Sequence, residues 1–301
     1  MNMSESQRVI YVAGLGHSGS TVLDMLLATG GKAVSLGQIW NVLREDPLKT
    51  STRFCTCGAS APDCGFWGPI LDRIATTRGT LSQDERYRLV LGRAKDLYGP
   101  HMAIVDSSKE VSHVATLAKV VPESRLAIVH NIRDVRAFTT SMIDNSVRKH
   151  NRRPLAEGLF LEWYRTNRSV HSKVSQVLGR PPLRVMYEAL CFATQAVAER
   201  VTELLGEQYI DPDASLKSGL THIISGNRFR LSDSTEATKL TYDYRWFDRS
   251  EWLRPYFLMP FVRKYNESCH REWQPHQALA PGRGAEPDLV SSMLASRLGK
   301  S

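Results

Sequence analysis

The chain has 301 residues, of which 42% are hydrophobic and 23% charged, with a formal net charge of +8. This length accommodates one large α/β domain or two small ones, and the composition excludes a disordered or fibrous chain. The surplus of Lys and Arg favours anionic ligands such as nucleotides, sulfated sugars, nucleic acid or acidic lipid, or else only aids solubility.

We expect neither a targeting segment nor a membrane span. The first eight residues are polar, and the first apolar run, 9–12, is too short for a signal core or a span. The five cysteines are an odd number and are not spread like a disulfide framework. The sequence therefore predicts a cytoplasmic protein.

The first predicted elements are a strand, a turn and a helix. Residues 8–13 are β-branched and aromatic, as in a buried strand, and a glycine-rich turn follows at 14–19. An apolar helix over 21–27 then stops at Gly30 and Gly31. This order is typical of the opening unit of a nucleotide-binding α/β domain.

Further strands alternate with helices along the chain. Because such alternation places helices on both faces of a parallel sheet, we predict a three-layer α/β/α fold. The predicted strands are 103–105, 125–129 and 183–187, and the helices that follow them are 111–120, 136–143 and about 193–205. We predict one domain over 1–274, with a Cys-rich insertion at 53–68 and a basic loop at 144–158. A linker and a short peripheral helix follow at 275–301.

The segment Gly14-Leu15-Gly16-His17-Ser18-Gly19-Ser20-Thr21 resembles a phosphate-binding loop. Gly14 and Gly19 have the Walker A spacing and Thr21 fits its final hydroxyl position, but Ser20 stands where that motif needs a lysine. Backbone N–H groups can still hold an anion there, whereas triphosphate hydrolysis is disfavoured. The alternative is an ordinary strand–helix turn built from small residues.

A second candidate phosphate motif lies at the end of the third predicted strand. Arg133 ends that strand, and Ser141 follows eight residues later. A planar guanidinium suits a phosphate, although an Arg and a helical Ser are also ordinary surface residues.

Together these motifs resemble the PAPS-dependent sulfotransferases of the bacterial type, PAPS being 3′-phosphoadenosine 5′-phosphosulfate. The run from His17 to Thr21 is similar to their 5′-phosphosulfate loop, commonly Lys/Arg-Ser-Gly-Thr-Thr, with His17 as a departure. Arg133 and Ser141 match the spacing of the family's pair for the 3′-phosphate. The resemblance covers about 8–252 and implies the P-loop NTPase-like sulfotransferase fold. PAPS would be the donor and adenosine 3′,5′-bisphosphate the product.

Three later stretches support the resemblance. The first stretch, Tyr187-Glu188-Ala189-Leu190, resembles the Tyr-Glu-Asp-Leu of the family. Residues 225–230 resemble the loop that closes over the nucleotide in the family, and residues 244–256 resemble the last helices of the family. The cofactor-binding residues that the resemblance implies are Gly16, His17, Ser18, Gly19, Ser20, Thr21, Arg133, Ser141, Asn227, Arg228 and Arg230.

Four residues are candidates for catalysis. His17 and Lys109 would stabilise charge on the bridging oxygen of the donor, since the family places a lysine close to position 109. The alternative for Lys109 is a solvated lysine at a helix start. Where some branches of the family have Gly-Glu as the base, this chain has Gly37-Gln38, so that Gln38 can only orient an acceptor. Glu110 remains as a base candidate.

Asp106 and His113 are neighbours of Glu110 and are further base candidates. None of the three is preferred strongly by the sequence, and an acidic acceptor such as a phenol depends less on a base.

Cys55, Cys57 and Cys64 lie within ten residues. They could start a zinc site, but no fourth ligand is evident nearby, and His101 or Cys269 would have to come from afar. We therefore favour a local disulfide or buried thiols and assign no metal. The family resemblance implies a structural element near the acceptor side, and the basic loop 144–158 either gates the site or is a solvated face.

The predicted function is sulfuryl transfer from PAPS to a small-molecule, glycan or lipid acceptor, with secondary metabolites included. A P-loop small-molecule kinase is one alternative, with Asp106 as its Mg²⁺ ligand. The other is a non-catalytic nucleotide- or RNA-binding module, although we expect no nucleic-acid partner. The oligomeric state, including a homodimer, stays open.

Overall fold

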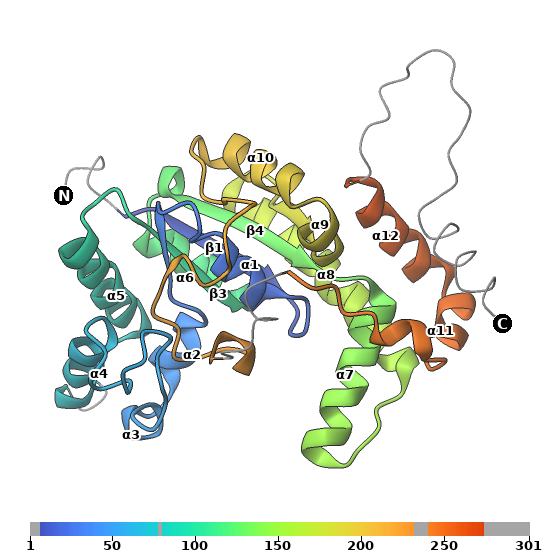
Figure 1. Ribbon diagram of the computed structural model, residues 1–301, viewed down its shortest axis with the longest axis horizontal. Helices are drawn as coiled ribbons and strands as arrows, with labels where there is room; N and C mark the ends of the chain where they lie inside the picture. Colours follow the sequence, from blue (N-terminus) through green and yellow to red (C-terminus); the bar gives the residue numbers. More distant parts are fainter. Residues whose placement is uncertain (1–6, 78–79, 232–239, 274–301) are drawn as a thin grey trace.

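A six-stranded parallel sheet forms the centre of the molecule (Figure 1). The computed structural model describes residues 7–77, 80–231 and 240–273. The sheet has the order β5-β4-β1-β3-β2-β6. Its strands are β1 (Val9–Gly14), β2 (Ala33–Ser35), β3 (Ala103–Lys109), β4 (Leu126–Ile132), β5 (Leu183–Met186) and β6 (Leu220–Thr221).

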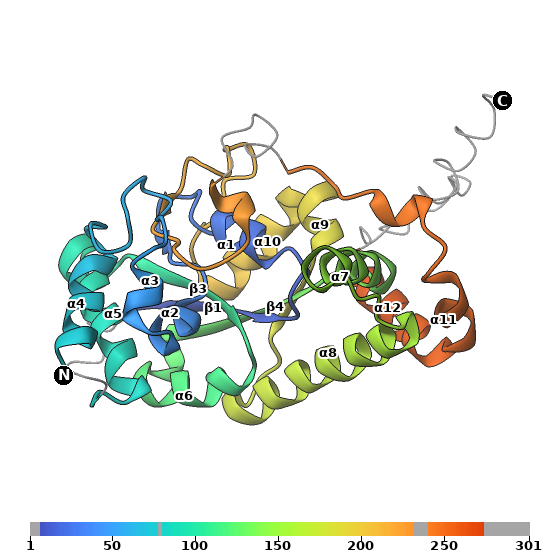
Figure 2. The same ribbon diagram turned by 90° about the horizontal axis from the view of Figure 1, so that it is seen from below.

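Helices cover both faces of this sheet (Figure 2). On one face lie α1 (Ser20–Leu26), α9 (Tyr187–Phe192) and α10 (Thr194–Leu205), and on the other α5 (Gln83–Tyr98), α6 (Ser112–Val120) and α8 (Ala156–Leu178). Because side chains alternate along a strand, Ile10 and Val12 of β1 join one core and Val9 and Tyr11 the other. The predicted three-layer α/β/α fold is thereby confirmed.

The remaining helices surround the carboxyl ends and flanks of the sheet (Figure 1). They are α2 (Ile39–Arg44), α3 (Pro47–Thr50), α4 (Trp67–Thr76), α7 (Val135–His150), α11 (Leu253–Leu258) and α12 (Pro260–Arg271). Short 3₁₀ helices are η2 (Glu123–Arg125), η3 (Arg228–Leu231) and η5 (Arg245–Asp248).

The register of the central strands brings the predicted motifs together at the carboxyl ends of the strands. Ala13 of β1 is paired with Lys109 of β3, and Gly14 is paired with Asn131 of β4. A Cβ at Gly14 would lie 2.3 Å from the carbonyl oxygen of Asn131, so the close approach of the two strands requires glycine there. Ligands of open α/β sheets bind at this edge, outside the carboxyl ends of the strands.

The predicted basic loop 144–158 is wrong. The helix expected over 136–143 continues as α7 to His150, and only 151–155 separates it from α8. Cations in the last turn of α7 stabilise it, because they lie at the negative end of the helix dipole. Asn151 ends the helix in a left-handed conformation (φ 49°), and Pro154 follows.

Two further predictions concern other parts of the chain. The linker and peripheral helix predicted at 275–301 lie outside the described residues, as does residue 274. Within the described ranges, no helix has both the length and the apolar character that crossing a membrane requires.

Candidate functional site

A cavity of about 480 Å³, here called the main cavity, opens at the carboxyl ends of β1, β3 and β4. It is lined by the loop after β1, the end of β3, the residue after β4, and parts of α7, α9 and the segment 240–245. Its lining residues are His17, Gly19, Ser20, Thr21, Val22, Lys109, Arg133, Ser141, Tyr187, Leu216, Asn227, Leu240, Thr241, Asp243 and Arg245.

Arg133 is held rigidly in the wall of the main cavity. Its Nη1 donates to the carbonyl of His17 (3.1 Å) and its Nη2 to a carboxylate oxygen of Asp243 (2.8 Å). The guanidinium lies 4.7 Å from the ring centroid of Tyr187. Its Nε is buried and has no hydrogen-bond partner within the described chain, so one donor of the fork is left for a ligand.

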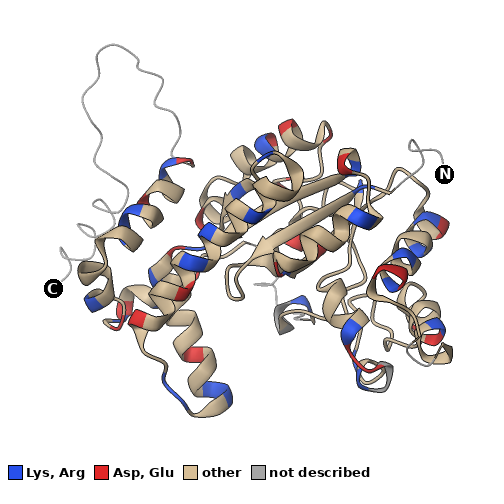
Figure 3. Cartoon of the chain, turned by 180° about the vertical axis from the view of Figure 1, so that it is seen from behind, with Lys and Arg blue, Asp and Glu red and all other residues tan. Residues whose placement is uncertain are grey.

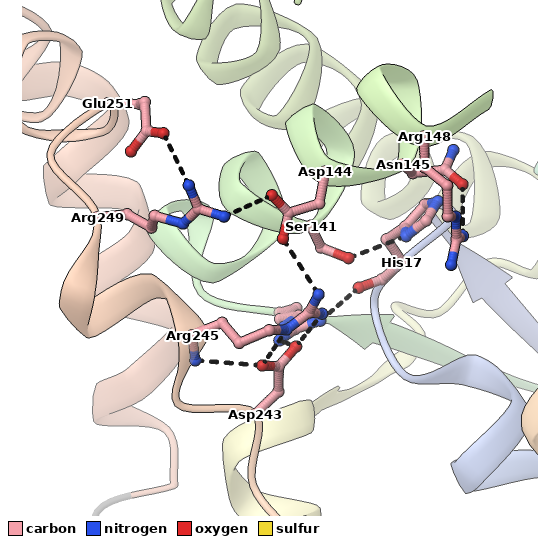
Figure 4. A network of polar contacts seen from close by, with 10 residues as sticks. His17, Ser141, Asp144, Asn145, Arg148, Asp243, Arg245, Arg249 and Glu251 are labelled. Carbon is pink, nitrogen blue, oxygen red and sulfur yellow. Dashed lines mark hydrogen bonds and ion pairs between the residues drawn. The ribbon is translucent and has the colours of Figure 1, made fainter. Parts of the chain in front are cut away.

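His17 and Ser141 meet across this cavity, as Figure 4 shows. His17 Nδ1 lies 2.9 Å from Ser141 Oγ. Burial, and then the positive charges of Lys109 and other nearby cations, lower the pKa of His17 to about 4. The imidazole is therefore neutral at pH 7. The backbone of His17 is left-handed (φ 65°), an uncommon conformation for a residue with a side chain.

Lys109 also has a left-handed backbone (φ 73°), and it ends β3 rather than starting a helix. Burial lowers its pKa, and the carboxylate of Asp24 opposes that shift. Asp24 is fully buried on α1 and accepts hydrogen bonds from Ser35 (2.7 Å) and Ser107 (2.6 Å). Burial nevertheless raises the pKa of Asp24 to about 7.

Asp243 and Arg245 connect the main cavity to α7 (Figure 4). Burial disfavours the charged form of Asp243, but hydrogen bonds from Arg245 and Arg133 outweigh it and hold the pKa of this carboxyl well below its usual range. Arg245 also pairs with Asp144 of α7 (3.1 Å). Three cations thus face one carboxylate in the main cavity, which favours an anionic ligand.

Other features of the main cavity fit the nucleotide that the sequence implies. Ser18 does not line the cavity itself, but its Oγ is buried in the adjoining loop and has no hydrogen-bond partner among the described residues. Val22, Leu216 and Leu240 add apolar surface that suits an aromatic base. Cations, free buried donors and apolar surface together fit a phosphorylated nucleoside.

A second cavity, also of about 480 Å³, lies on the other side of the loop after β1. It is lined by Gly14, Leu15, Gly16, Gln38, Asn41, Ser108, Lys109, Glu110, Val111, Ser112, Thr166, Val170 and Lys173. Of the described residues, Lys109 alone lines both cavities. Lys109 therefore lies at the boundary between the two cavities.

Two polar side chains of the second cavity, Gln38 and Glu110, already have partners in the protein. The Gln38 side-chain oxygen accepts a hydrogen bond from the amide of Asn41. The exposed carboxylate of Glu110 pairs with Arg44 (3.1 Å) and lies 3.5 Å from His113. Burial lowers the pKa of His113 to about 4.

Asp106 lies outside both cavities. It is fully buried, and its carboxylate accepts hydrogen bonds from Tyr87 (3.1 Å) and from Ser108. Burial raises its pKa to about 7.

The predicted residues divide into three groups. His17, Gly19, Ser20, Thr21, Lys109, Arg133, Ser141 and Asn227 line the main cavity, and Gly16, Gln38, Lys109 and Glu110 line the second. Arg230 lines neither, because its guanidinium donates to backbone carbonyls of its own loop, including those of Ile223 (3.2 Å) and Ile224 (3.1 Å). Ser18 also lines neither cavity, since its side chain is buried in the loop after β1. The side chain of Arg228 lies outside the described part.

Asp24, Asp243 and Arg245 escaped the sequence analysis. A carboxylate inside the apolar run 21–27 was a usable signal for Asp24. The other two lie far along the chain from the phosphate motifs, and only the fold brings them there.

The three cysteines of the insertion are free thiols, of which Cys55 and Cys64 are buried and Cys57 is exposed. Of the two interpretations that we favoured, the local disulfide is wrong, and buried thiols are confirmed for Cys55 and Cys64. The thiols of Cys55, Cys57 and Cys64 gather around His222, not around His101 or Cys269.

No protein-family model matches this chain, and no curated protein matches it. Solved structures show weak likeness to it. The sulfotransferase domain from the Synechococcus PCC 7002 olefin synthase has a TM-score of 0.44 at 16% identity, over 99% of this chain and 96% of that one. Sulfotransferase STF1 from Mycobacterium tuberculosis H37Rv has a TM-score of 0.44 at 12% identity, over 87% and 77%.

Sulfotransferase STF9 from Mycobacterium avium has a TM-score of 0.41 at 15% identity, over 71% of this chain and 66% of that one. Likenesses this distant carry no argument about chemistry, which has to come from the site itself.

Proposed function

We propose that this chain is a sulfotransferase that moves a sulfuryl group from PAPS to a hydroxyl acceptor. The observation that carries the proposal is that His17, Lys109, Arg133 and Ser141 line one cavity. The loop beside them has Ser20 where a nucleoside triphosphatase needs lysine.

The main cavity would hold the nucleotide. Arg133 and Ser141 would bind the 3′-phosphate, with the free Nε of Arg133 as an additional donor. The loop from Gly16 to Thr21 would bind the 5′-phosphosulfate through its N–H and hydroxyl groups. When bound, PAPS supplies the sulfuryl group and leaves as adenosine 3′,5′-bisphosphate.

The protein would act mainly by electrostatics and positioning, as in phosphoryl transfer. Lys109 would stabilise the negative charge that grows on the leaving oxygen, because it stands between the two cavities. His17 would donate an N–H to the same leaving oxygen. It would do so as a neutral imidazole, because its pKa is lowered to about 4.

The acceptor would bind in the second cavity, which is lined by amide, hydroxyl and charged side chains. Glu110 would accept the proton of the acceptor hydroxyl, and Gln38 would orient that hydroxyl. This lining suits a polar acceptor, whether a sugar, a phenol, a lipid headgroup or a secondary metabolite.

The kinase alternative lacks a metal ligand where it needs one. Asp106 is buried away from both cavities and is hydrogen-bonded to Tyr87 and Ser108. The carboxylate that does line the main cavity, Asp243, is paired with Arg133 and Arg245. Neither carboxylate is available to bind Mg²⁺ beside a triphosphate.

The nucleic-acid alternative is not favoured by the distribution of charged residues along the helices in Figure 3. Figure 3 shows Lys and Arg interspersed with Asp and Glu over the helices in that view, rather than gathered in one stripe. Binding of a nucleic-acid backbone depends on such a stripe.

Calorimetry of adenosine 3′,5′-bisphosphate with EDTA present tests the proposal. We expect micromolar binding by the wild type and a loss of about 100-fold in Arg133→Ala, since the positive charge and its charge-assisted hydrogen bond disappear. Arg249→Ala is the matched control, because this arginine pairs with Asp144 and does not line the main cavity.

An absence of bisphosphate binding, together with Mg²⁺-dependent binding of ATP, would overturn the proposal in favour of the kinase. Equal losses in Arg133→Ala and Arg249→Ala would show that the bisphosphate binds outside the main cavity.

A further inference from the structure

Four potential metal ligands converge outside both cavities. Cys55, Cys57 and Cys64 come from the insertion, and His222 follows directly after the edge strand β6. One ligand atom from each lies within 4.8 Å of the other three. The sequence separates His222 from the nearest of these cysteines by 158 positions, so only the fold assembles the set.

Four of the six distances between the ligand atoms are close to those of a tetrahedron around one ion, and the other two are within 4.8 Å. Cys64 Sγ lies 3.5 Å from Cys55 Sγ and 3.7 Å from Cys57 Sγ. His222 Nδ1 lies 3.3 Å from Cys64 Sγ and 3.7 Å from Cys55 Sγ. Tetrahedral zinc, with bonds of about 2.3 Å to sulfur and about 2.0–2.1 Å to nitrogen, separates sulfurs by about 3.8 Å and sulfur from nitrogen by about 3.6 Å.

The backbone of the insertion holds the cysteines in this arrangement. Cys55 N donates to the carbonyl of Ala59 (2.9 Å), and Gly58 N donates back to the carbonyl of Cys55 (3.0 Å). The tight turn between them contains Gly58 with φ +90°, a conformation that favours glycine. Cys64 N donates to the carbonyl of Ser60 (2.9 Å). The two halves of the insertion are therefore tied together close to their thiols.

His222 is held from the opposite side. Its backbone N–H donates to Ser35 of β2 (2.8 Å), and its carbonyl accepts from the indole N–H of Trp67. Its ring stacks on Phe66, with ring centroids 5.6 Å apart and planes 19° from parallel. These contacts fix the imidazole with Nδ1 facing the thiols, as a metal-binding histidine requires.

We propose that Cys55, Cys57, Cys64 and His222 bind one zinc ion in a tetrahedral, structural site. Three thiolates and an imidazole are the ligands zinc prefers in closed sites, and the full set leaves no position for substrate. On binding, each thiol gives its proton to solvent, and each sulfur donates a lone pair to the metal. This inference replaces our expectation of no metal and is independent of the proposed sulfuryl transfer.

The metal would connect the insertion to the segment that leads to the main cavity. Thr56 already meets that segment, since its hydroxyl accepts from Ile223 N (3.0 Å) and its N–H donates to the carbonyl of Ile223 (3.2 Å). Four residues further on, Asn227 lines the main cavity. Zinc would thus hold the 222–230 segment in place without touching the nucleotide.

Metal analysis of the full chain, purified without chelators or metal-affinity resin, tests the proposal. We expect about one zinc ion per chain in the wild type and less than about a tenth of one in Cys64→Ser. Cys191→Ser and Cys269→Ser are matched controls that should keep the zinc, since both thiols lie outside the cluster.

A wild-type chain that contains no zinc and takes up none when it is added would overturn the proposal, as would zinc retained by Cys64→Ser. A disulfide among the three cysteines, detected by mass spectrometry after thiol alkylation, would overturn it equally.

A second measurement does not depend on whether the variant folds. Zinc is removed from the wild type and Co²⁺ is added in its place, and the absorption spectrum is recorded. Intense visible bands of tetrahedral Co²⁺, with thiolate charge-transfer bands in the near ultraviolet, are expected. The weak spectrum of octahedral cobalt would contradict the proposed ligand set.

Discussion

The two cavities that share Lys109 are of similar size but differ in how their polar groups are engaged. In the main cavity, three cations face one carboxylate, and the buried Arg133 Nε has no partner among the described residues. In the second cavity, Gln38 is hydrogen-bonded to Asn41, and Glu110 is paired with Arg44.

The difference indicates how each cavity would select its ligand. Buried donors without partners favour a fixed set of anionic groups, because leaving them unsatisfied is costly. Exposed or half-buried side chains that pair with each other can change partners at little cost, so the second cavity can adapt to the acceptor. We therefore expect substitutions in the main cavity to affect donor binding, and those in the second to affect transfer alone.

Lys109→Met should have the largest effect, because this side chain lines both cavities. We expect kcat for sulfuryl transfer to fall by about 10²–10³, the usual loss when one group that stabilises the transition state is removed. Steady-state kinetics with PAPS as donor and a phenolic dye as acceptor would measure it. Lys173→Met, which changes a lysine of the second cavity only, should keep most of the activity.

Glu110→Gln should come next. If Glu110 accepts the proton of the acceptor, kcat falls by about 10² while bisphosphate affinity is unchanged. Glu207→Gln is the control, since Glu207 is also exposed and ion-paired, here with Lys32. Unchanged kcat in Glu110→Gln would remove this residue from the mechanism and leave the second cavity without an identified base.

Asp243→Asn should strengthen bisphosphate binding, whereas Arg133→Ala should weaken it. The Asp243 carboxylate neutralises Arg133 and Arg245 and repels a phosphate placed beside it. Its removal should tighten bisphosphate binding about tenfold at low salt, measured by calorimetry. Asp144→Asn, which also releases Arg245 but does not line the main cavity, should change the affinity less. Weaker binding in Asp243→Asn would mean that this carboxylate chiefly positions Arg133.

His17→Lys should have the smallest effect, visible as a change in pH dependence. The pKa of His17 in the free protein is lowered to about 4. We expect a phosphate bound beside it to raise this pKa, so that at acid pH, unlike at pH 7, the imidazole takes up a proton on binding. The contribution of His17 to affinity is therefore fully present below about pH 4 and is lost as pH rises through the pKa of the complex.

The second ionisation of the phosphates, near pH 6, affects the wild type and the variant alike. The ratio of their dissociation constants isolates His17. This ratio should change about threefold or more between pH 5 and 8, in favour of the wild type at low pH. A constant ratio would mean that His17 stays neutral in the complex.

The parts of the molecule that were predictable are those built from neighbouring residues. The loop at 14–19 and Arg133 lie directly after buried strands, and parallel strands bring their carboxyl ends together. Asp243 and His222 could not be found in this way, because each depends on the packing of a distant segment. The basic run after residue 143 was misread because charge was taken to indicate a loop, whereas cations stabilise a helix end.

Backbone strain at the site has a consequence for selection on stability. Among the described residues, only His17, Lys109 and Asn151 are non-glycine residues with positive φ, and Asn tolerates that conformation well. Glycine would relax the backbone at the other two. A search for heat-resistant variants alone would therefore favour substitutions at the two residues that we propose for catalysis. Under such selection the thermal stability of the protein would rise and its proposed sulfuryl-transfer activity would fall.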